Sequence, residues 1–406
     1  MRVLLSTIGS RGDVQPLVAL ASELRGLGQE VRLCVPPDFR GWIEGLGFTV
    51  VPIGPELRST ASPGAARPTA EQWRQLIDGT VATQFATIAD AAQDCDVILA
   101  GGALNIAARS IAEKIGIGYV YASYCPVSLP SPHHAPPPVA RSLQTPVEEG
   151  LDNLTLWAKD AEHWNGLFGP AFNSHRAAIG LAPIKEGRDH IFTDRPWLAA
   201  DPTLAPWPDP ADGKVVQTGA WILPDARPLP ADLVTFLEAG EPPIYFGFGS
   251  IRAPQGLAQT MIQSARALGR RAIMSRGWAD LALVDNEPDC LAIGEINQQA
   301  LFKRVAAVVH HGGAGTTTAA ARAGAPQVVL PQHYDQFYWA GRVEHLGIGT
   351  AHPPVAPTAD SLTTALRHTL HADLAARAAV IAAAVRTDGA RNAAHRLMAM
   401  DSQKSA

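Results

Sequence analysis

Two segments of this chain share one local pattern, in which a short apolar run leads into a Gly-Ser turn and then into a stretch of helical period. The first is the run at residues 3–8 before Gly9-Ser10, and the second is the run at residues 244–248 before Gly249-Ser250. Further short apolar runs occur at residues 31–35, 49–53, 96–100, 271–275, 290–293, 306–310 and 327–330. Apolar strands that alternate with helices form parallel sheets, so the sequence predicts an α/β fold with two doubly wound domains.

The length of the chain agrees with two domains. It has 406 residues, of which 47% are hydrophobic and 17% charged, and this is enough for two cores of ordinary size. Prolines crowd residues 202–230, which is typical of a linker. We therefore predict an N-terminal domain at 1–205, a linker at 206–230, a C-terminal domain at 231–385 and a terminal helix at 386–406. The helical stretch before the C-terminus, about 375–400, carries Thr387-Asp388-Gly389 as a bend.

Composition argues against several classes of partner and site. The formal net charge is −5 and no Lys/Arg-rich block occurs, so nucleic acid is not an expected partner. The first residues lack the apolar length of a signal peptide, and no later run approaches the ~18 residues of a membrane span. We expect a cytoplasmic monomer without stable membrane association. The four cysteines are scattered without a CxxC pair, so we expect reduced thiols and no metal site.

The segment at residues 308–318 (VVHHGGAGTTT) has the composition of a phosphate site. An apolar run breaks there into histidine, glycines and hydroxyls where a helix begins. The start of a helix offers unpaired backbone N–H groups and the positive end of its dipole, and glycines let an anion approach the backbone closely. A plain strand-to-helix turn is the alternative. After the next apolar run come Asp335 and Gln336, which are suited to bind sugar hydroxyls, so the two segments together indicate a sugar nucleotide. A helix N-terminal carboxylate beside a polar neighbour is the alternative for this pair.

A second proline-rich stretch, at residues 125–138, is too long for an ordinary connection. Such loops are either functional or irregular surface segments, and we keep both interpretations, an acceptor-side loop and a surface insertion. We interpret His133 and His134 within it as solvated loop histidines and not as a metal pair.

Taken together, the motifs resemble the nucleotide-sugar glycosyltransferases of the GT-B fold, which have two facing Rossmann-like domains with a cleft between them. The segments that carry this resemblance are 9–16 (GSRGDVQP), 310–317 (HHGGAGTT) and 331–336 (PQHYDQ). Within that superfamily the chain resembles the bacterial enzymes that glycosylate vancomycin-type glycopeptide aglycones. The segments 124–127, 130–136, 218–225 and 275–280 carry this closer likeness, which spans nearly the whole chain.

The resemblance implies that the C-terminal domain binds the donor. Gly313, Gly315 and Thr316 would bind the diphosphate, and His311 would hydrogen-bond it and offset its charge as it leaves. Ser250 would contact a phosphate or the sugar, with a helix cap as its alternative role. The nucleotide base would lie against Ile296. The resemblance also implies that the final helix crosses back to the N-terminal domain.

Asp13 is the expected general base. An acceptor hydroxyl must lose its proton as it attacks the anomeric carbon, and a carboxylate on a loop at a strand end can accept it. No histidine precedes Asp13, whereas many plant relatives use a histidine near this place. The alternative is a carboxylate that caps a helix beginning near Pro16, with Arg11 as its surface partner. Arg11 could instead reach the donor diphosphate, and we include Ser10 and Arg11 among the donor-binding residues.

The expected function is inverting, metal-independent transfer of a hexose to a hydroxyl of a glycopeptide aglycone, with no cofactor besides the donor. UDP-hexose is the preferred donor, and dTDP-sugar is the alternative. A sterol or glycolipid acceptor is the first alternative, because fungal and bacterial enzymes for those acceptors share the segment at 9–16. A sugar-nucleotide epimerase and a noncatalytic nucleotide-sugar binder are further alternatives. A hybrid of two related enzymes joined near the linker would carry the same motifs.

Overall fold

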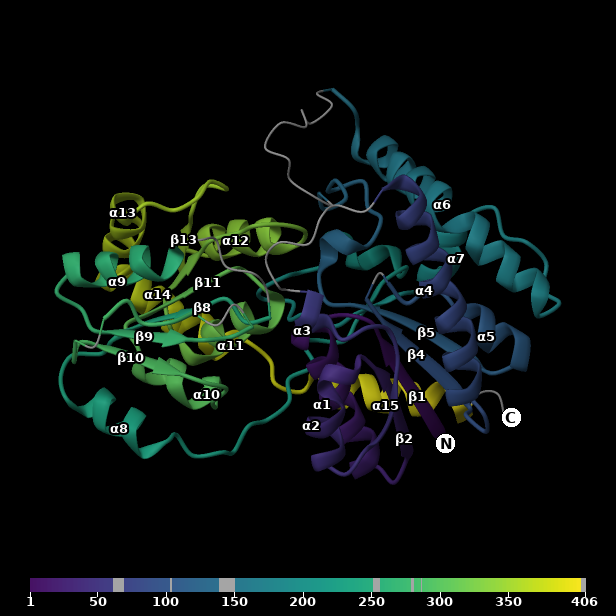
Figure 1. The fold of residues 1–406 in the computed structure, drawn as a ribbon, viewed down its shortest axis with the longest axis horizontal. Helices are drawn as coiled ribbons and strands as arrows, with labels where there is room; N and C mark the ends of the chain where they lie inside the picture. Colours follow the sequence, from purple (N-terminus) through teal and green to yellow (C-terminus); the bar gives the residue numbers. More distant parts are fainter. Residues whose placement is uncertain are drawn as a thin grey trace.

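The structure, a computed structural model, contains two parallel β-sheets, each flanked by helices (Figure 1). It describes residues 1–60, 69–102, 104–138, 150–250, 256–278, 281–285 and 287–402. The first sheet has seven strands in the order β3-β2-β1-β4-β5-β6-β7, and the second has six in the order β10-β9-β8-β11-β12-β13. Every strand pair in these residues is parallel. The predicted α/β class with two parallel-sheet domains is confirmed.

The strands fall close to the apolar runs that the sequence marks. Those of the first sheet are β1 (Arg2–Thr7), β2 (Glu30–Val35), β3 (Thr49–Pro52), β4 (Val97–Gly101), β5 (Gly118–Ser123), β6 (Trp197–Leu198) and β7 (Val216–Gln217). Those of the second sheet are β8 (Ile244–Gly247), β9 (Ala272–Ser275), β10 (Cys290–Ile293), β11 (Ala307–His310), β12 (Gln327–Val329) and β13 (Gly349–Ala351).

Helices connect the strands and cover the sheets. The N-terminal half contains α1 (Arg11–Gly26), α2 (Arg40–Gly45), α3 (Leu57–Thr60), α4 (Ala70–Ala91), α5 (Ala108–Ile115), α6 (Asn153–Ala178) and α7 (Gly187–Phe192). The C-terminal half contains α8 (Ala231–Glu238), α9 (Leu257–Ala267), α10 (Gln298–Leu301), α11 (Ala314–Ala323), α12 (Gln336–His345), α13 (Ala359–Thr369), α14 (Ala372–Ala384) and α15 (Gly389–Ser402). Short 3-10 turns lie at Pro37–Phe39, Pro126–Ser128, Pro210–Asp212 and Phe302–Arg304.

Both sheets reverse their strand order at the same place. In the first sheet β1 lies between β2 and β4, and in the second β8 lies between β9 and β11. At such a reversal, the chain continues to one side of the sheet after one strand and to the other side after its neighbour. A crevice therefore opens at the carboxyl ends of these strands. The two Gly-Ser turns follow β1 and β8, so both lie at such a reversal point.

Helix α1 begins earlier than the sequence predicted. The expected start was near Pro16, but Ser10 is the N-cap and the helix runs from Arg11. A capping box explains this, because the backbone N–H of Ser10 donates to Oδ2 of Asp13 at 2.8 Å and the N–H of Gly12 donates to Oγ of Ser10 at 3.3 Å. Asp13 therefore lies within the first turn of α1.

The predicted linker also differs from the structure. Part of the range 206–230 is β7, which pairs with β6 at the edge of the first sheet. Both strands have only two residues, so an apolar pattern of period two cannot reveal them. The longer β5 and the edge strand β13 were also absent from the prediction.

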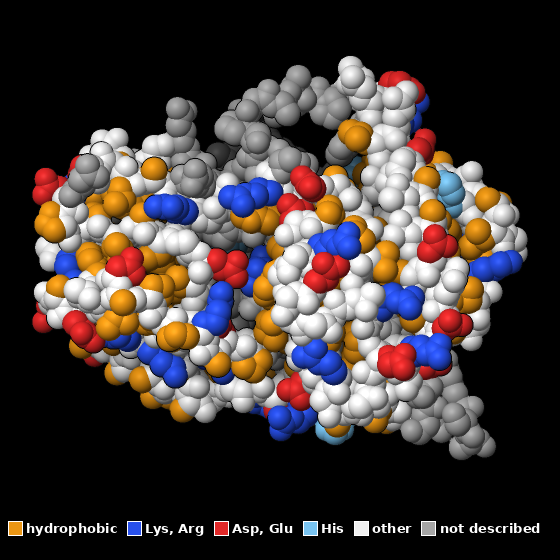
Figure 2. All heavy atoms as spheres, turned by 60° about the horizontal axis from the view of Figure 1, so that its bottom comes forward, with side chains coloured by type: hydrophobic (Ala, Val, Ile, Leu, Met, Phe, Trp, Pro, Cys, Tyr) orange, Lys and Arg blue, Asp and Glu red, His pale blue; other side chains and the backbone are white. Residues whose placement is uncertain are grey.

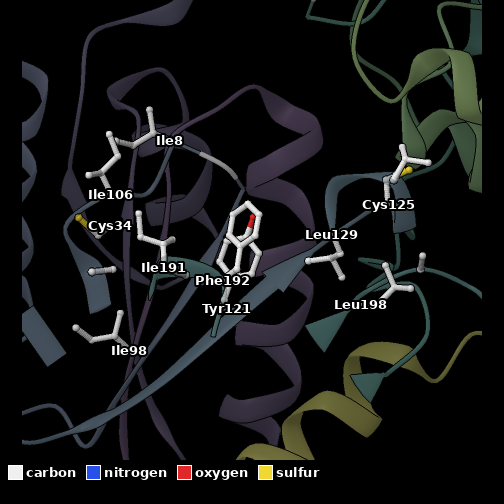
Figure 3. Close-up of a cluster of buried hydrophobic side chains, with 14 of the residues drawn as sticks. Ile8, Cys34, Ile98, Ile106, Tyr121, Cys125, Leu129, Ile191, Phe192 and Leu198 are labelled. Atoms are coloured by element: carbon white, nitrogen blue, oxygen red, sulfur yellow. The ribbon is translucent and has the colours of Figure 1, made fainter. Parts of the chain in front are cut away.

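A hydrophobic cluster continues from the first domain into the second. It contains Tyr121, Cys125 and Trp207 from the N-terminal half together with Trp339 and Val343 of α12. Figure 3 shows part of it, with the rings of Tyr121 and Phe192 stacked at a centroid distance of 4.7 Å. The two lobes in Figure 1 are thus joined by packed apolar side chains as well as by the chain.

The last helix returns to the first domain. Helix α15 packs along α1, and Arg391 forms an ion pair with Glu23 at 3.3 Å (Figure 1). The helix starts where Gly389 lies against the backbone of Gly219 and Ala220, so closely that a Cβ at position 389 would collide with both. The chain bends at residues 385–388, between α14 and α15.

The surface carries charges of both signs. On the face shown in Figure 2, Lys and Arg side chains alternate with Asp and Glu, and neither sign forms a continuous patch. Within the described residues, no helix is long and apolar enough to span a bilayer.

Candidate active site

The carboxylates and the histidine that the sequence singled out lie just after the strands β1, β11 and β12. Asp13 follows β1 in the first domain, whereas His311 and Asp335 follow β11 and β12 in the second. Arg11, two residues before Asp13, forms an ion pair with Glu295 of the second domain at 2.9 Å, so the start of α1 lies against that domain. The candidate site is therefore shared by the two domains.

The loop between β11 and α11 has the form of an anion cradle. Gly312 has a φ of 93°, and a Cβ there would lie 2.8 Å from Cγ1 of Val329. A Cβ on Gly313 would lie 2.6 Å from Nε2 of His311, so only glycine leaves room for the imidazole. Gly313 is the N-cap of α11 and supplies no side chain to its first turn. The first N–H groups of α11 are therefore free of side-chain caps and can bind an anion.

The imidazole of His311 lies over this loop. Burial and the neighbouring His310 and His333 lower the pKa of His311 from 6.5 to about 3. Its Nδ1 has no hydrogen-bond partner in the described structure. A neutral ring can offer a hydrogen bond to a ligand, and the role of His311 in offsetting the charge of the leaving group stays a prediction.

Asp13 is held in a half-buried position at the start of α1. Removal from water raises its pKa from 3.8 to about 6, although hydrogen bonds from Ser10 oppose the shift. The hydroxyl of Tyr124, which lies just after β5, donates to the backbone carbonyl of Asp13 at 3.0 Å. The close packing of the loop is visible at Gly9, where a Cβ would collide with the carboxylate. A carboxylate with a pKa of about 6 is ionised at neutral pH and basic enough to accept a proton.

The alternative role of Asp13 as a capping carboxylate is confirmed by the capping box, whereas Arg11 does not pair with Asp13, and that part of the alternative was wrong. Nη2 of Arg11 donates to Oε1 of Glu295 in the second domain at 2.9 Å, and its guanidinium stacks 3.6 Å above the ring of Trp42. Its Nε donates to Oε1 of Gln15 at 3.1 Å. The expectation that Arg11 reaches across to the donor domain agrees with this direction, but the partner is a carboxylate.

Asp335 and Gln336, which follow β12, have different roles. Oδ2 of Asp335 accepts a hydrogen bond from Nε1 of Trp339 at 3.1 Å, and burial raises the pKa of Asp335 to about 6. Gln336 is buried, and its Oε1 accepts from the backbone N–H groups of Gln332 at 2.8 Å and His333 at 3.3 Å. Gln336 therefore organises the loop and has only its amino group left to offer a ligand.

Ser250 and Ile296 lie shortly after the strands β8 and β10 of the second domain. Ser250 follows β8 and is half-buried; the N-cap of α9 is Gly256, so the alternative of Ser250 as that cap was wrong. Ile296 is half-buried after β10, beside Asn297, whose Nδ2 donates to the carbonyls of Asp225 and Arg227 at 2.8 Å each. These bonds tie the proposed base-binding loop to the connection between the domains.

Gly315 and Thr316 lie in the first turn of α11. Gly315 is exposed, and outside its own helix no described atom lies within 4 Å of the position that a Cβ would take. Thr316 is half-buried. The neighbouring Thr317 is not available in the same way, because its hydroxyl donates to the carbonyl of Gly313 at 3.0 Å.

Several residues at the site were missed from the sequence. Trp278 of the second domain stacks on Phe39 of the first, with ring centroids 5.9 Å apart and an interplanar angle of 20°. Tyr124 and Glu295 are the other two, through the contacts described above. Tyr124 and Trp278 lie in segments that carry the family resemblance, but no local pattern indicates their contacts.

His134 is not the solvated histidine that we predicted. Its ring packs edgewise against Trp157 and Trp207, at 6.1 Å and 6.0 Å, and neither ring nitrogen has a hydrogen-bond partner among the residues that the structure describes. Residues 125–127, 129 and 131 are buried and residues 130, 132, 133, 135 and 138 are exposed, while residues 139–149 lie outside the described residues. Among the residues that the structure describes, no group of three or more His, Cys, Asp or Glu side chains is placed to hold a metal ion.

Comparison with known proteins identifies the class to which this fold and site belong. The glycosyltransferase family 28 N-terminal domain matches residues 3–130. The C-terminal domain of erythromycin biosynthesis protein CIII-like proteins matches residues 261–395. Among solved structures, the glycotransferase of kitacinnamycin superposes with a TM-score of 0.74 at 19% identity, covering 98% of both chains. The calicheamicin glycosyltransferase CalG4 gives 0.70 at 17% identity, covering 98% of this chain and 97% of its own. The fold is therefore that of GT-B glycosyltransferases.

Closer relatives come from Amycolatopsis orientalis. Glycosyltransferase GtfE is 52% identical over 402 residues, covering 98% of this chain and 97% of the relative. The vancomycin aglycone glucosyltransferase is 50% identical over 401 residues with the same coverage. The dTDP-epi-vancosaminyltransferase is 44% identical over 390 residues, covering 94% and 93%. The chain belongs to the vancomycin group of GT-B glycosyltransferases, and it is a hexosyltransferase.

Proposed function

We propose that this enzyme transfers a hexose from a nucleoside-diphosphate sugar to a hydroxyl of a vancomycin- or teicoplanin-type glycopeptide aglycone, with inversion at the anomeric carbon. The observation that carries the proposal is the uncapped, glycine-built start of α11, whose backbone N–H groups can bind a diphosphate. A relative that covers almost the whole chain supports the acceptor class, since it is named for the vancomycin aglycone.

The reaction would be a single displacement. Asp13 would accept the proton of the acceptor hydroxyl while the oxygen of that hydroxyl attacks C1 of the sugar. The nucleoside diphosphate would leave toward the N-terminus of α11, where backbone N–H groups and the helix dipole stabilise negative charge. His311 would donate a hydrogen bond to the leaving group. A helix terminus performs here the electrostatic work of a cation, so we propose that the reaction needs no metal ion and no cofactor besides the donor.

Donor recognition would involve residues from both domains. Gly313, Gly315 and Thr316 would bind the diphosphate, and Asp335 would bind sugar hydroxyls with one free carboxylate oxygen. Ser250 and Ile296 would complete the pocket at the phosphate or sugar and at the base. We prefer UDP-glucose as donor, because Asp335 and Gln336 suit a fully hydroxylated sugar and one relative is named a glucosyltransferase. We keep dTDP-sugars as the alternative, because another relative is named for a dTDP-sugar. We further propose a monomer that acts in the cytoplasm.

The test is a transfer assay with a vancomycin-type aglycone and, in separate reactions, UDP-glucose, UDP-N-acetylglucosamine and a dTDP-deoxysugar, followed by product mass. We expect a hexose mass increase with UDP-glucose. The Asp13→Asn variant should lose about 10²- to 10⁴-fold of the rate and still bind nucleotide, because the amide oxygen can replace the carboxylate as acceptor of the Ser10 N–H. Nucleotide binding without transfer to any aglycone would contradict the glycopeptide assignment and favour a sterol or lipid acceptor.

A further inference from the structure

His310 is a fully buried histidine at the end of β11, immediately before the candidate phosphate loop. Both nitrogens of its ring are hydrogen-bonded. The backbone N–H of Gly312 donates to Nδ1 at 3.0 Å, and Nε2 lies 2.9 Å from Oε1 of Gln327 on β12. The side chain therefore bridges the loop and the neighbouring strand.

These two bonds fix one tautomer of His310. A backbone N–H can only donate, so Nδ1 must be the unprotonated acceptor. The proton of the neutral ring is then on Nε2, which donates to the amide oxygen of Gln327. Burial lowers the pKa of His310 from 6.5 to about 4, so the ring remains neutral and keeps its acceptor throughout the neutral range.

The loop changes direction at Gly312, whose N–H donates the hydrogen bond to His310. Gly312 has a φ of 93° and is enclosed. A Cβ added there would lie 2.8 Å from Val329 and 3.0 Å from the carbonyl oxygen of Gln336. The next residue, Gly313, is the N-cap of α11 and lies under the ring of His311. Fixing the Gly312 amide thus fixes both the start of α11 and the peptide that carries His311.

We propose that His310 is a positioning residue for donor binding: its Nδ1 holds the Gly312 amide so that His311 and the first N–H groups of α11 face the diphosphate. The inference rests on the proposed donor site. His310 touches no donor atom in this scheme and acts through the backbone of the loop. A buried histidine that only fills the core would stabilise the domain without favouring any particular loop geometry, and this difference can be tested.

Two substitutions separate the roles. His310→Leu replaces the imidazole with an apolar side chain of similar size and so removes the hydrogen-bond acceptor. His310→Asn leaves a small cavity but places Oδ1 close to the position of Nδ1, where it can accept from Gly312. We expect His310→Leu to raise the Kd for UDP and dTDP about tenfold, and the donor KM similarly, with the acceptor KM unchanged. His310→Asn should bind nucleotide within about threefold of the wild type, even if its Tm is lower.

The control is His352, another buried histidine of the same domain, whose Nδ1 lies 2.8 Å from the carbonyl of Pro353 and whose Nε2 lies 2.9 Å from Oγ of Ser361. His352→Leu should lower the Tm without changing nucleotide affinity. Hydrogen exchange of a peptide covering residues 307–316 should become faster in His310→Leu and not in His352→Leu. This exchange measurement reports on the loop even if the leucine variant is too weak for kinetics.

The outcomes distinguish this inference from the proposed function. A folded His310→Leu variant that binds UDP or dTDP as the wild type does would overturn the positioning role and leave the donor site intact. An asparagine variant as weak as the leucine variant would also overturn it, because affinity would then follow packing and not the acceptor. Failure of the wild type to bind either nucleotide would overturn the donor site and this inference with it.

Discussion

Nη2 of Arg11 lies 2.9 Å from Oε1 of Glu295, and this ion pair joins the first residue of α1 to the loop after β10 in the other domain. Asp13 follows Arg11 by two residues, and Ile296 follows Glu295. The pair therefore connects the proposed base with the proposed nucleotide-base pocket. Glu295 is 60% exposed and Arg11 26%, so the ion pair is worth at most about 1 kcal/mol and depends on salt.

Glu295→Gln should raise the donor KM about two- to fivefold at low salt, because the closed arrangement of the domains loses one interdomain ion pair. Steady-state kinetics at about 50 mM and about 500 mM NaCl would show the effect: the wild-type KM should rise with salt and the variant KM should not. Glu30→Gln, which removes the exposed partner of Arg2 at 3.3 Å, is the control and should change nothing. An unchanged salt dependence in Glu295→Gln would contradict the prediction.

Tyr124→Phe should lower kcat about five- to tenfold with little change in nucleotide affinity. The phenol donates to the backbone carbonyl of Asp13 at 3.0 Å, and its loss leaves the base loop less well fixed by about 1 kcal/mol. The ring itself should stay in place, because it packs edgewise on Trp221 at 6.2 Å. The matched control is Tyr119→Phe, whose hydroxyl donates to the carbonyl of Ile191 at 3.1 Å. Equal losses in both variants would mean a general effect on stability.

The rate should fall as the pH decreases through about 6, because Asp13 must be ionised to accept a proton and its pKa is raised to about 6. Below that pH, kcat/KM should lose about a factor of ten per pH unit. A pH–rate profile of kcat/KM checks this. A rate that stays constant down to pH 4 would exclude Asp13, with its raised pKa, as the base.

The same pKa has a consequence for stability. Its folded value lies above 3.8, so folding favours the protonated carboxyl, and the contribution of Asp13 to stability decreases as the pH rises from about 4 through about 6. Asp13→Asn should therefore have a Tm about 2–4 °C higher than the wild type at pH 8 and nearly the same Tm near pH 4. Calorimetry of the two proteins at both pH values measures the difference. An inactive variant that is less stable at pH 8 would show that the carboxylate is structurally required.

Gly389→Ala should destabilise the protein by about 2 kcal/mol or more, because the added Cβ would collide with the backbone of Gly219 and Ala220 and lift α15 away from the linker. Thermal unfolding measures the loss. Gly79→Ala in α4 is the control, since no atom lies within 4 Å of its Cβ position and alanine favours a helix by up to about 1 kcal/mol. A Gly389→Ala protein as stable as the wild type would mean that the start of α15 can shift without cost.

The architecture was predictable because it depends on local patterns. Residues 3–8 and 244–248 are apolar runs that end in Gly-Ser, and both became central strands at the point where the sheet order reverses. The turn at residues 311–313 was predictable for the same reason, because glycines that follow an apolar run and precede a helical stretch indicate a strand-to-helix turn. The start of α1 was misplaced because the capping box of Ser10 and Asp13 ends the loop sooner than the proline suggested.

The sequence by itself determined the two parallel sheets, the family and the segments that carry Asp13, His311 and Asp335. These features depend on strand period, turn residues and motif spacing, which are all properties of short stretches of chain. Tertiary structure decided which groups meet. Arg11 pairs with Glu295, 284 positions away, and the ring of His134 packs against two tryptophans. Such contacts depend on how elements distant in the chain pack against each other, and no local pattern contains that information.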